Sequence, residues 1–172
     1  MSNDNLFAAL RAAFPADLDS VAVETDGGLA YSWRDLDRAS AMIANLLQSL
    51  DIPRDPTGVP PRVAVQVEKS VEAMLLYLGA LRAGFVFLPL NTAYQSAEIE
   101  YFVGNAKPAV VVCTGRNFPW VSQLAFQAGT RHVFTLNDDR SGSLLERAAH
   151  CSDVQTPARR GLDDLAAILY TS

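Results

Sequence analysis

The chain has 172 residues, of which 49% are hydrophobic and 19% charged, and its formal net charge at pH 7 is −5. This composition predicts a soluble globular domain with a core of its own and excludes a disordered chain. The negative charge gives no electrostatic support to binding of nucleic acid or of an anionic membrane, so small molecules are the favoured partners.

A hairpin and a helix are predicted first along the chain. The apolar runs Val21 to Glu24 and Leu29 to Tyr31 flank the turn sequence Asp26-Gly27-Gly28, which is typical of a short β-hairpin. Ser32 follows as a helix N-cap with Asp35 three residues later, and apolar side chains then recur at helical spacing. We therefore expect an amphipathic helix directly after the hairpin.

Apolar runs and helix-length segments alternate through the rest of the chain. Such runs, buried on both faces, are typical of parallel strands joined by helical crossovers. The expected fold class is α/β, with an open, mostly parallel five-stranded sheet wrapped by helices and a short N-terminal hairpin. The expected strands are Arg62 to Val67, Phe85 to Leu90, Ala109 to Cys113, His132 to Leu136 and Leu165 to Tyr170, and the helices between them Ser70 to Ala83, Ser96 to Ala106, Phe118 to Ala128 and Ser143 to Ala149.

Two segments read as surface connections. Residues 51–61 contain four prolines, which neither a helix nor a central strand accepts, and residues 150–162 are mostly polar. Ligands of open parallel sheets bind beyond the carboxyl ends of the strands. We therefore expect a binding site near the residues that end or follow the five strands, namely Glu68, Asn91, Thr114, Asn137 and Ser172.

The common nucleotide motifs are missing from the chain. No G-x-G-x-x-G spacing follows the first strand, which argues against a dinucleotide fold. Gly79 and Gly84 have the spacing of a phosphate loop, but Phe85 and Val86 stand where Lys and Ser or Thr are needed. We interpret Gly79 as a close-packing residue and Gly84 as a helix terminator.

No catalytic or metal-binding residue can be assigned. Acidic residues do not cluster at the expected strand ends, which argues against a magnesium-binding receiver domain. His132 and His150 have no carboxylate or hydroxyl partner at a telling spacing, and we interpret both as structural. The pairs Glu68-Lys69 and Arg159-Arg160 read as solvated charges in loops.

The cysteines and the N-terminal residues give information about the cellular location of the protein. Cys113 and Cys151 lack the spacing of a metal or redox motif, and the first ten residues lack the features of a signal peptide. The apolar stretch of residues 73–90 is interrupted by Arg82, so it is predicted to be a helix and a strand, not a membrane span. We expect a cytoplasmic protein.

Three stretches resemble the first, the second and the beginning of the third core motif of the adenylate-forming superfamily. The stretch of residues 67–113 is further similar to bacterial malonyl-CoA synthetases, and the resemblance covers essentially the whole chain. The three stretches are AYSWRDLDRAS (30–40), LRAGFVFLPLN (81–91) and LAAILYTS (165–172).

The resemblance implies an AMP-forming acid–CoA ligase. Such enzymes use ATP, Mg²⁺ and coenzyme A, and here the acid would be malonate or a similar short carboxylic acid. Thr171 and Ser172 match the first two positions of the loop that wraps the ATP phosphates. The resemblance therefore implies that residues 1–172 are the N-terminal part of the large AMP-binding domain, ending before that loop is complete, and that they bind no cofactor and are inactive alone.

Two other readings remain open. A flavodoxin-like small-molecule-binding module without catalysis would have a similar pattern of strands and helices. A scaffold domain that self-associates through apolar surface is the third reading, because helices or strands that normally cover such a sheet would be missing.

Overall fold

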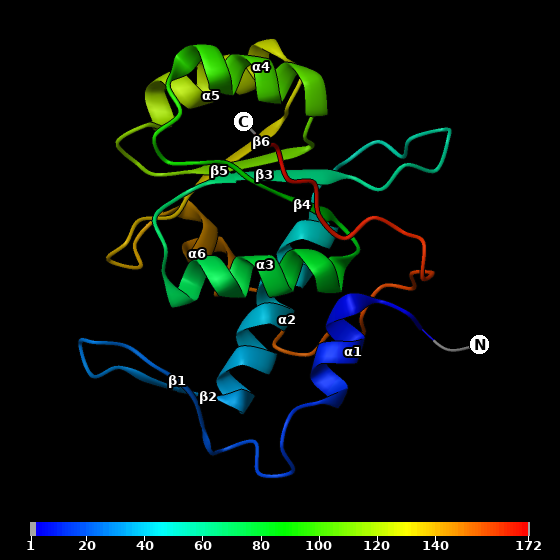
Figure 1. Ribbon diagram of the computed structural model, residues 1–172, viewed down its shortest axis with the longest axis vertical. Helices are drawn as coiled ribbons and strands as arrows, with labels where there is room; N and C mark the ends of the chain where they lie inside the picture. Colours follow the sequence, from blue (N-terminus) through cyan, green and yellow to red (C-terminus); the bar gives the residue numbers. More distant parts are fainter. Residues whose placement is uncertain (1–2, 172) are drawn as a thin grey trace.

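A computed structural model describes residues 3–171 as a twisted sheet between helices, with a separate hairpin (Figure 1). The helices are α1 (Leu6–Ala12), α2 (Trp33–Ser49), α3 (Val71–Ala83), α4 (Ser96–Ala106), α5 (Phe118–Gln127) and α6 (Ser143–Ala148), and the strands are β1 (Val21–Glu24), β2 (Ala30–Ser32), β3 (Arg62–Gln66), β4 (Val86–Pro89), β5 (Val110–Cys113) and β6 (His132–Thr135).

The main sheet is parallel and has the strand order β4-β3-β5-β6. Helices α4 and α5 cover one face, and α2, α3 and α6 lie on the other (Figure 1). Each face has its own apolar core, so the strands carry buried side chains on both sides. All four residues of β5 are buried, which explains why an uninterrupted apolar run forms this central strand. The predicted α/β class and the wrapped parallel sheet are confirmed.

The expected fifth strand is not formed in full. Of residues 165–170, only Ala167 makes a parallel bridge, to Phe87. The Phe87 amide donates to the carbonyl of Ala166 at 3.0 Å, and the Ile168 amide donates to the carbonyl of Phe87 at 2.9 Å. The direction of this segment is as predicted, but it pairs with β4 at one bridge only, so the described sheet has four strands.

The hairpin and the helix after it form where the local sequence predicts them. Strands β1 and β2 are antiparallel, and Gly28 takes the left-handed backbone that the turn requires, with φ of 80°. The Ser32 hydroxyl accepts from the Asp35 amide at 3.1 Å, and the Asp35 carboxylate accepts from the Ser32 amide at 2.8 Å. This capping box begins α2 at the predicted place.

Gly79 and Gly84 have the structural roles that the sequence predicted for them. A β-carbon on Gly79 would lie 2.7 Å from Cγ2 of Ile43, so the missing side chain lets α3 approach α2. Gly84 ends α3 with φ of 81°. Neither glycine belongs to a phosphate loop.

The short helix α1 was not predicted. Asn5 caps it by accepting from the Phe7 amide at 2.9 Å, and Phe7 is fully buried. The guanidinium of Arg82 lies 4.6 Å from the Phe7 ring centre. Seven residues are too few for a helix that is stable by itself, so α1 depends on this distant contact.

Candidate functional site

The carboxyl ends of the parallel strands surround an open hollow of about 1060 Å³. Glu68, Asn91, Thr114 and Asn137 all line it, as expected from their positions after successive strands. Four of the five residues expected at the strand ends therefore line one hollow, and ligand binding there stays a prediction. We call this space the carboxyl-end hollow.

Side-chain amides hold the loops around the carboxyl-end hollow. Asn137 Oδ1 accepts from the Gly115 amide at 2.8 Å, which joins the loops after β5 and β6. Gln66, at the end of β3, donates from Nε2 to the carbonyls of Asn91 at 2.9 Å and Tyr94 at 3.0 Å. The backbone around the hollow is thus fixed by groups within the chain.

Thr114 presents an unused hydroxyl at the carboxyl-end hollow. Its Oγ1 atom is buried and has no hydrogen-bond partner among residues 3–171. Buried hydroxyls are normally hydrogen-bonded, so this atom is a candidate contact for a ligand. Sequence analysis placed Thr114 at the strand end but gave no reason to single out its hydroxyl.

The charges of the carboxyl-end hollow are balanced. Lys69 and Arg116 line it together with Glu68 and Asp138, and none of these four takes part in an ion pair within residues 3–171. Lys69, Glu68 and Arg116 are exposed, as the loop reading of Glu68-Lys69 predicted. The lining therefore offers hydrogen bonds and both signs of charge to a polar ligand.

Within residues 3–171, neither a reactive Cys113 thiolate nor a cluster of metal-binding side chains is seen. Burial raises the pKa of the Cys113 thiol to about 12, so the thiol stays protonated near neutral pH. Within residues 3–171, no group of three or more His, Cys, Asp or Glu side chains could hold a metal ion.

The histidines lie apart from the carboxyl-end hollow. His132 begins β6 at the opposite end of the strand, where its Nε2 is 3.3 Å from the Asp51 carbonyl. His150 is exposed after α6. Neither histidine lines the hollow.

Tyr31 joins the hairpin to the start of α3. Its hydroxyl donates to Glu72 Oε1 at 2.6 Å, and this hydrogen bond to a carboxylate raises the pKa of Tyr31. Glu72 is in the first turn of α3, one residue before Ala73, which lines the carboxyl-end hollow. Sequence analysis missed this pair because its members are 41 positions apart.

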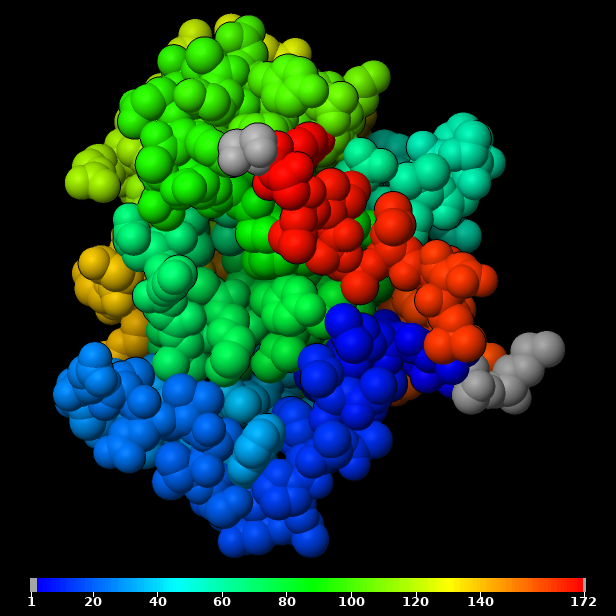
Figure 2. Space-filling model, in the orientation of Figure 1, coloured from blue at the N-terminus to red at the C-terminus, as the bar shows by residue number. Residues whose placement is uncertain are grey.

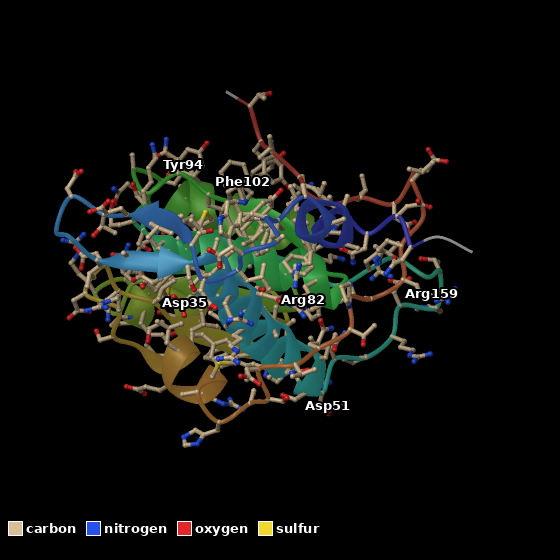
Figure 3. All side chains as sticks on the ribbon, turned by 90° about the horizontal axis from the view of Figure 1, so that it is seen from below. Asp35, Asp51, Arg82, Tyr94, Phe102 and Arg159 are labelled. Atoms are coloured by element: carbon tan, nitrogen blue, oxygen red, sulfur yellow. The ribbon has the colours of Figure 1, made fainter. Side chains whose placement is uncertain are left out.

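The two residues assigned to phosphate binding stand at the chain end. Thr171 is exposed and is not among the residues that line the carboxyl-end hollow. Ser172 lies outside the described residues. In the preceding residue, the centre of the Tyr170 ring lies 4.4 Å from the centre of the Phe102 ring. Figure 3 labels Phe102 beside Tyr94. The Tyr170 hydroxyl donates to Asn105 Oδ1 at 2.5 Å. The assignment of Thr171 and Ser172 stays a prediction.

No helix among the described residues has the length and apolar character needed to cross a bilayer.

Comparison with solved structures gives a match along nearly the whole chain. MatB from Rhodopseudomonas palustris, solved both without ligand and with ATP bound, is 43% identical with a TM-score of 0.90. The match covers 99% of this chain and 33% of that one. An anthranilate CoA ligase, AuaEII, shares the fold with a TM-score of 0.84 at 16% identity.

Curated relatives are more distant in sequence. Tyrocidine synthase 1 of Brevibacillus parabrevis is 27% identical over 167 residues, which is 97% of this chain and 14% of that protein. The long-chain-fatty-acid–CoA ligase FadD13 of Mycobacterium tuberculosis is 26% identical over 152 residues, which is 87% of this chain. The chain spans 29% of FadD13.

The family described as AMP-binding enzyme matches residues 10–172. This match includes the hairpin, the parallel sheet and the residues around the carboxyl-end hollow. The chain belongs to the AMP-binding family of adenylate-forming enzymes.

Proposed function

We propose that the chain is part of an AMP-forming acid–CoA ligase that activates malonate or a similar short carboxylic acid. In this reaction the acid's carboxylate attacks the α-phosphorus of ATP, an acyl-adenylate forms and pyrophosphate leaves. The thiol of coenzyme A then attacks the acyl carbon, a thioester forms and AMP leaves. The match to MatB, over 99% of the chain at 43% identity, is the observation that carries the proposal.

The family membership favours ATP as the nucleotide, since MatB has been solved with ATP bound. Within this chain, the rim of the carboxyl-end hollow would contribute hydrogen-bond donors and acceptors to the bound substrates. Thr171 and Ser172 would begin the loop that holds the phosphates, because hydroxyls there can donate to the phosphate oxygens.

Magnesium would offset the charge of the phosphates during adenylate formation. Within residues 3–171, no group of three or more His, Cys, Asp or Glu side chains could hold it. We therefore assign none of these residues to Mg²⁺, and we assign none to coenzyme A.

Malonate is proposed from sequence similarity. MatB, a malonyl-CoA synthetase, is 43% identical to the chain, whereas FadD13, a long-chain-fatty-acid–CoA ligase, is 26% identical. This difference favours a short acid over a long one. The flavodoxin-like module is the weaker alternative, because the family match covers residues 10–172.

A chimera tests the proposed reaction. In it, this chain replaces the matching third of R. palustris MatB, and thioester formation from coenzyme A is followed by mass spectrometry with malonate, methylmalonate, acetate and a long-chain fatty acid. We expect the malonyl thioester as the main product. A folded chimera that makes no thioester, or that has lost the preference of MatB for malonate over the fatty acid, would refute the compatibility of this chain with a short-acid ligase.

The phosphate assignment is tested in the same chimera. We expect Thr171→Ala to lower the rate at saturating malonate by about tenfold and to raise the KM for ATP, since a charge-assisted hydrogen bond is lost. Thr156→Ala, an exposed threonine in the surface connection, is the matched control and should leave both values unchanged. Equal behaviour of the two variants would contradict the assignment.

A further inference from the structure

A second hollow, of about 830 Å³, lies at the opposite end of the sheet. Its lining includes Arg62 at the start of β3 and residues just before β4 and β5, together with the connection of residues 51–61. Figure 2 shows this connection (teal) beside the C-terminal segment (orange to red). We call this space the amino-end hollow.

The amino-end hollow gathers positive charge in a chain that is negative overall. Arg54, Arg62, Lys107 and Arg160 line it, against one carboxylate, that of Asp55. None of the four cations forms an ion pair within the described part of the chain. By contrast, four other arginines pair with aspartates elsewhere: Arg11, Arg34, Arg38 and Arg82.

The carboxylate of Asp55 is already engaged. The Thr57 amide donates to its Oδ1 at 2.7 Å, and the Thr57 hydroxyl donates to the same atom. The hydroxyl hydrogen bond lowers the pKa of Asp55, which is therefore fully ionised at neutral pH. One exposed, locally bonded carboxylate leaves most of the positive charge in the hollow uncompensated.

Two of the cations are held in place by backbone carbonyls. Arg62 Nη1 donates to the carbonyl of Ala106 at 2.9 Å, at the end of α4. Arg160 donates from Nη2 to the carbonyl of Gly84 and from Nη1 to that of Arg159 at 2.9 Å. Sequence analysis expected Arg159 and Arg160 to be solvated, which is correct for the exposed Arg159 but wrong for Arg160.

Arg160 also has an unused donor. Its Nε atom is buried and has no hydrogen-bond acceptor within residues 3–171. A buried donor without an acceptor is costly, and more so on a charged group. An anionic ligand would supply the missing acceptor and would reduce the repulsion among the four cations.

We propose that the amino-end hollow binds a small molecule with two or more anionic groups, either phosphates or carboxylates. Arginine guanidinium groups recognise both through paired N–H donors. Its volume is within the range of small-molecule sites, about 300–1,000 Å³. The amino-end hollow and the carboxyl-end hollow lie at opposite ends of the parallel strands, and a five-residue strand is about 15 Å long. The amino-end hollow is therefore distinct from the proposed ATP site.

Titration of the 172-residue chain with pyrophosphate, and separately with citrate, tests the proposal by NMR. We expect saturable shifts of the backbone amides of Arg54, Arg62 and Lys107 and of the Nε–H signal of Arg160. A tighter response to pyrophosphate would indicate a phosphorylated ligand and a tighter response to citrate a polycarboxylate. Shifts confined to the carboxyl-end hollow, or no saturable shift with either probe, would refute the proposal.

A double variant separates a specific site from general charge effects. Arg54→Gln with Lys107→Gln removes two cations for which no hydrogen bond is seen within residues 3–171, so the fold should be preserved. We expect the dissociation constant for the better probe to rise about tenfold. Arg159→Gln removes a neighbouring charge outside the hollow and should change it less than about twofold. Equal dissociation constants for the wild type and the double variant would overturn the proposal.

Discussion

The parallel sheet and the C-terminal segment, residues 150–171, both contain apolar runs, but only those of the sheet become full strands. Every residue of β5 is buried. In the C-terminal segment, Leu162, Leu165 and Leu169 are 86%, 54% and 71% exposed. Strand β5 has a strand on each side and a core on each face, whereas the C-terminal segment pairs with β4 at a single bridge and leaves these leucines exposed.

Polar contacts connect the C-terminal segment to the rest of the chain. Arg82 Nε donates to Gln155 Oε1 at 2.8 Å, and Asn5 Nδ2 donates to the carbonyl of Ala158 at 2.8 Å. Farther along, the segment pairs with Phe87 at one bridge. The sheet therefore owes its stability to buried apolar surface, whereas the C-terminal segment combines hydrogen bonds with the partial burial of Ile168 and Tyr170.

The two cysteines provide the sharpest contrast between these regions, because Cys113 is in β5 and Cys151 lies near the start of the C-terminal segment. The pKa of Cys113 is raised by burial to about 12 from its usual 9.0, which makes its thiolate about a thousandfold scarcer near pH 8. We expect a thiol reagent to label Cys151 at least that much faster in the native chain. In denaturant both should react alike, and similar native rates would contradict the buried position of Cys113.

A substitution of Arg82 is the next test, because this side chain connects the C-terminal segment to the helices on one face of the sheet. Its guanidinium also donates to Asp37 Oδ1 at 2.8 Å, and its side chain is 8% exposed. Arg82→Met should lower the free energy of unfolding by about 3 kcal/mol, since buried partners are left unpaired. Urea denaturation measures the change.

Arg38→Met is the matched control for Arg82→Met. Arg38 pairs with Asp153 of the same segment at 3.5 Å, but both side chains are about half exposed. Its loss should cost less than about 0.5 kcal/mol. Equal losses for the two variants would show that the buried network does not hold the segment.

A substitution at the close contact between α2 and α3 should have a smaller effect on the free energy of unfolding. Gly79→Ala would place a β-carbon 2.8 Å from Cβ of Ile43, and overpacking should lower the free energy of unfolding by about 2 kcal/mol. Gly104→Ala in α4 is the control, because nothing lies within 4 Å of its added carbon, and it should stabilise the chain by about 0.5 kcal/mol. The same sign for both variants would contradict this contact.

The smallest effect is expected at the chain end. Tyr170→Phe removes the hydrogen bond to Asn105 and should lower the free energy of unfolding by about 0.5 kcal/mol. It should also speed hydrogen exchange at the Ile168 amide, which bonds to Phe87. Tyr101→Phe, on the exposed face of α4, should change neither value. Unchanged exchange in Tyr170→Phe would indicate that the bridge holds without Tyr170.

Local sequence was enough to predict the hairpin, the capping box at Ser32 and the four parallel strands, because turn residues, caps and apolar runs act within a few positions. It also placed Thr114 and Asn137 at the carboxyl ends of the parallel strands. The helix α1 was missed because its stability comes from Phe7 packing under Arg82, far along the chain. The fifth strand was overestimated because the apolar run does not reveal that Leu165 and Leu169 stay exposed in the folded chain.

The amino-end hollow could not have been predicted from sequence. Its cations, Arg54, Arg62, Lys107 and Arg160, come from four separate stretches and meet only in the folded chain. The buried hydroxyl of Thr114 is similar, because its lack of a partner depends on the loops around it.

The most direct test of the proposed function is pyrophosphate exchange into ATP by the chimera that carries this chain in MatB. Exchange reports adenylate formation alone, without the coenzyme A step. We predict exchange that depends on malonate in the chimera and none by the 172-residue chain alone. A folded chimera that fails to exchange, or that exchanges equally well without malonate, would contradict the proposal that this chain is part of a malonate-activating enzyme.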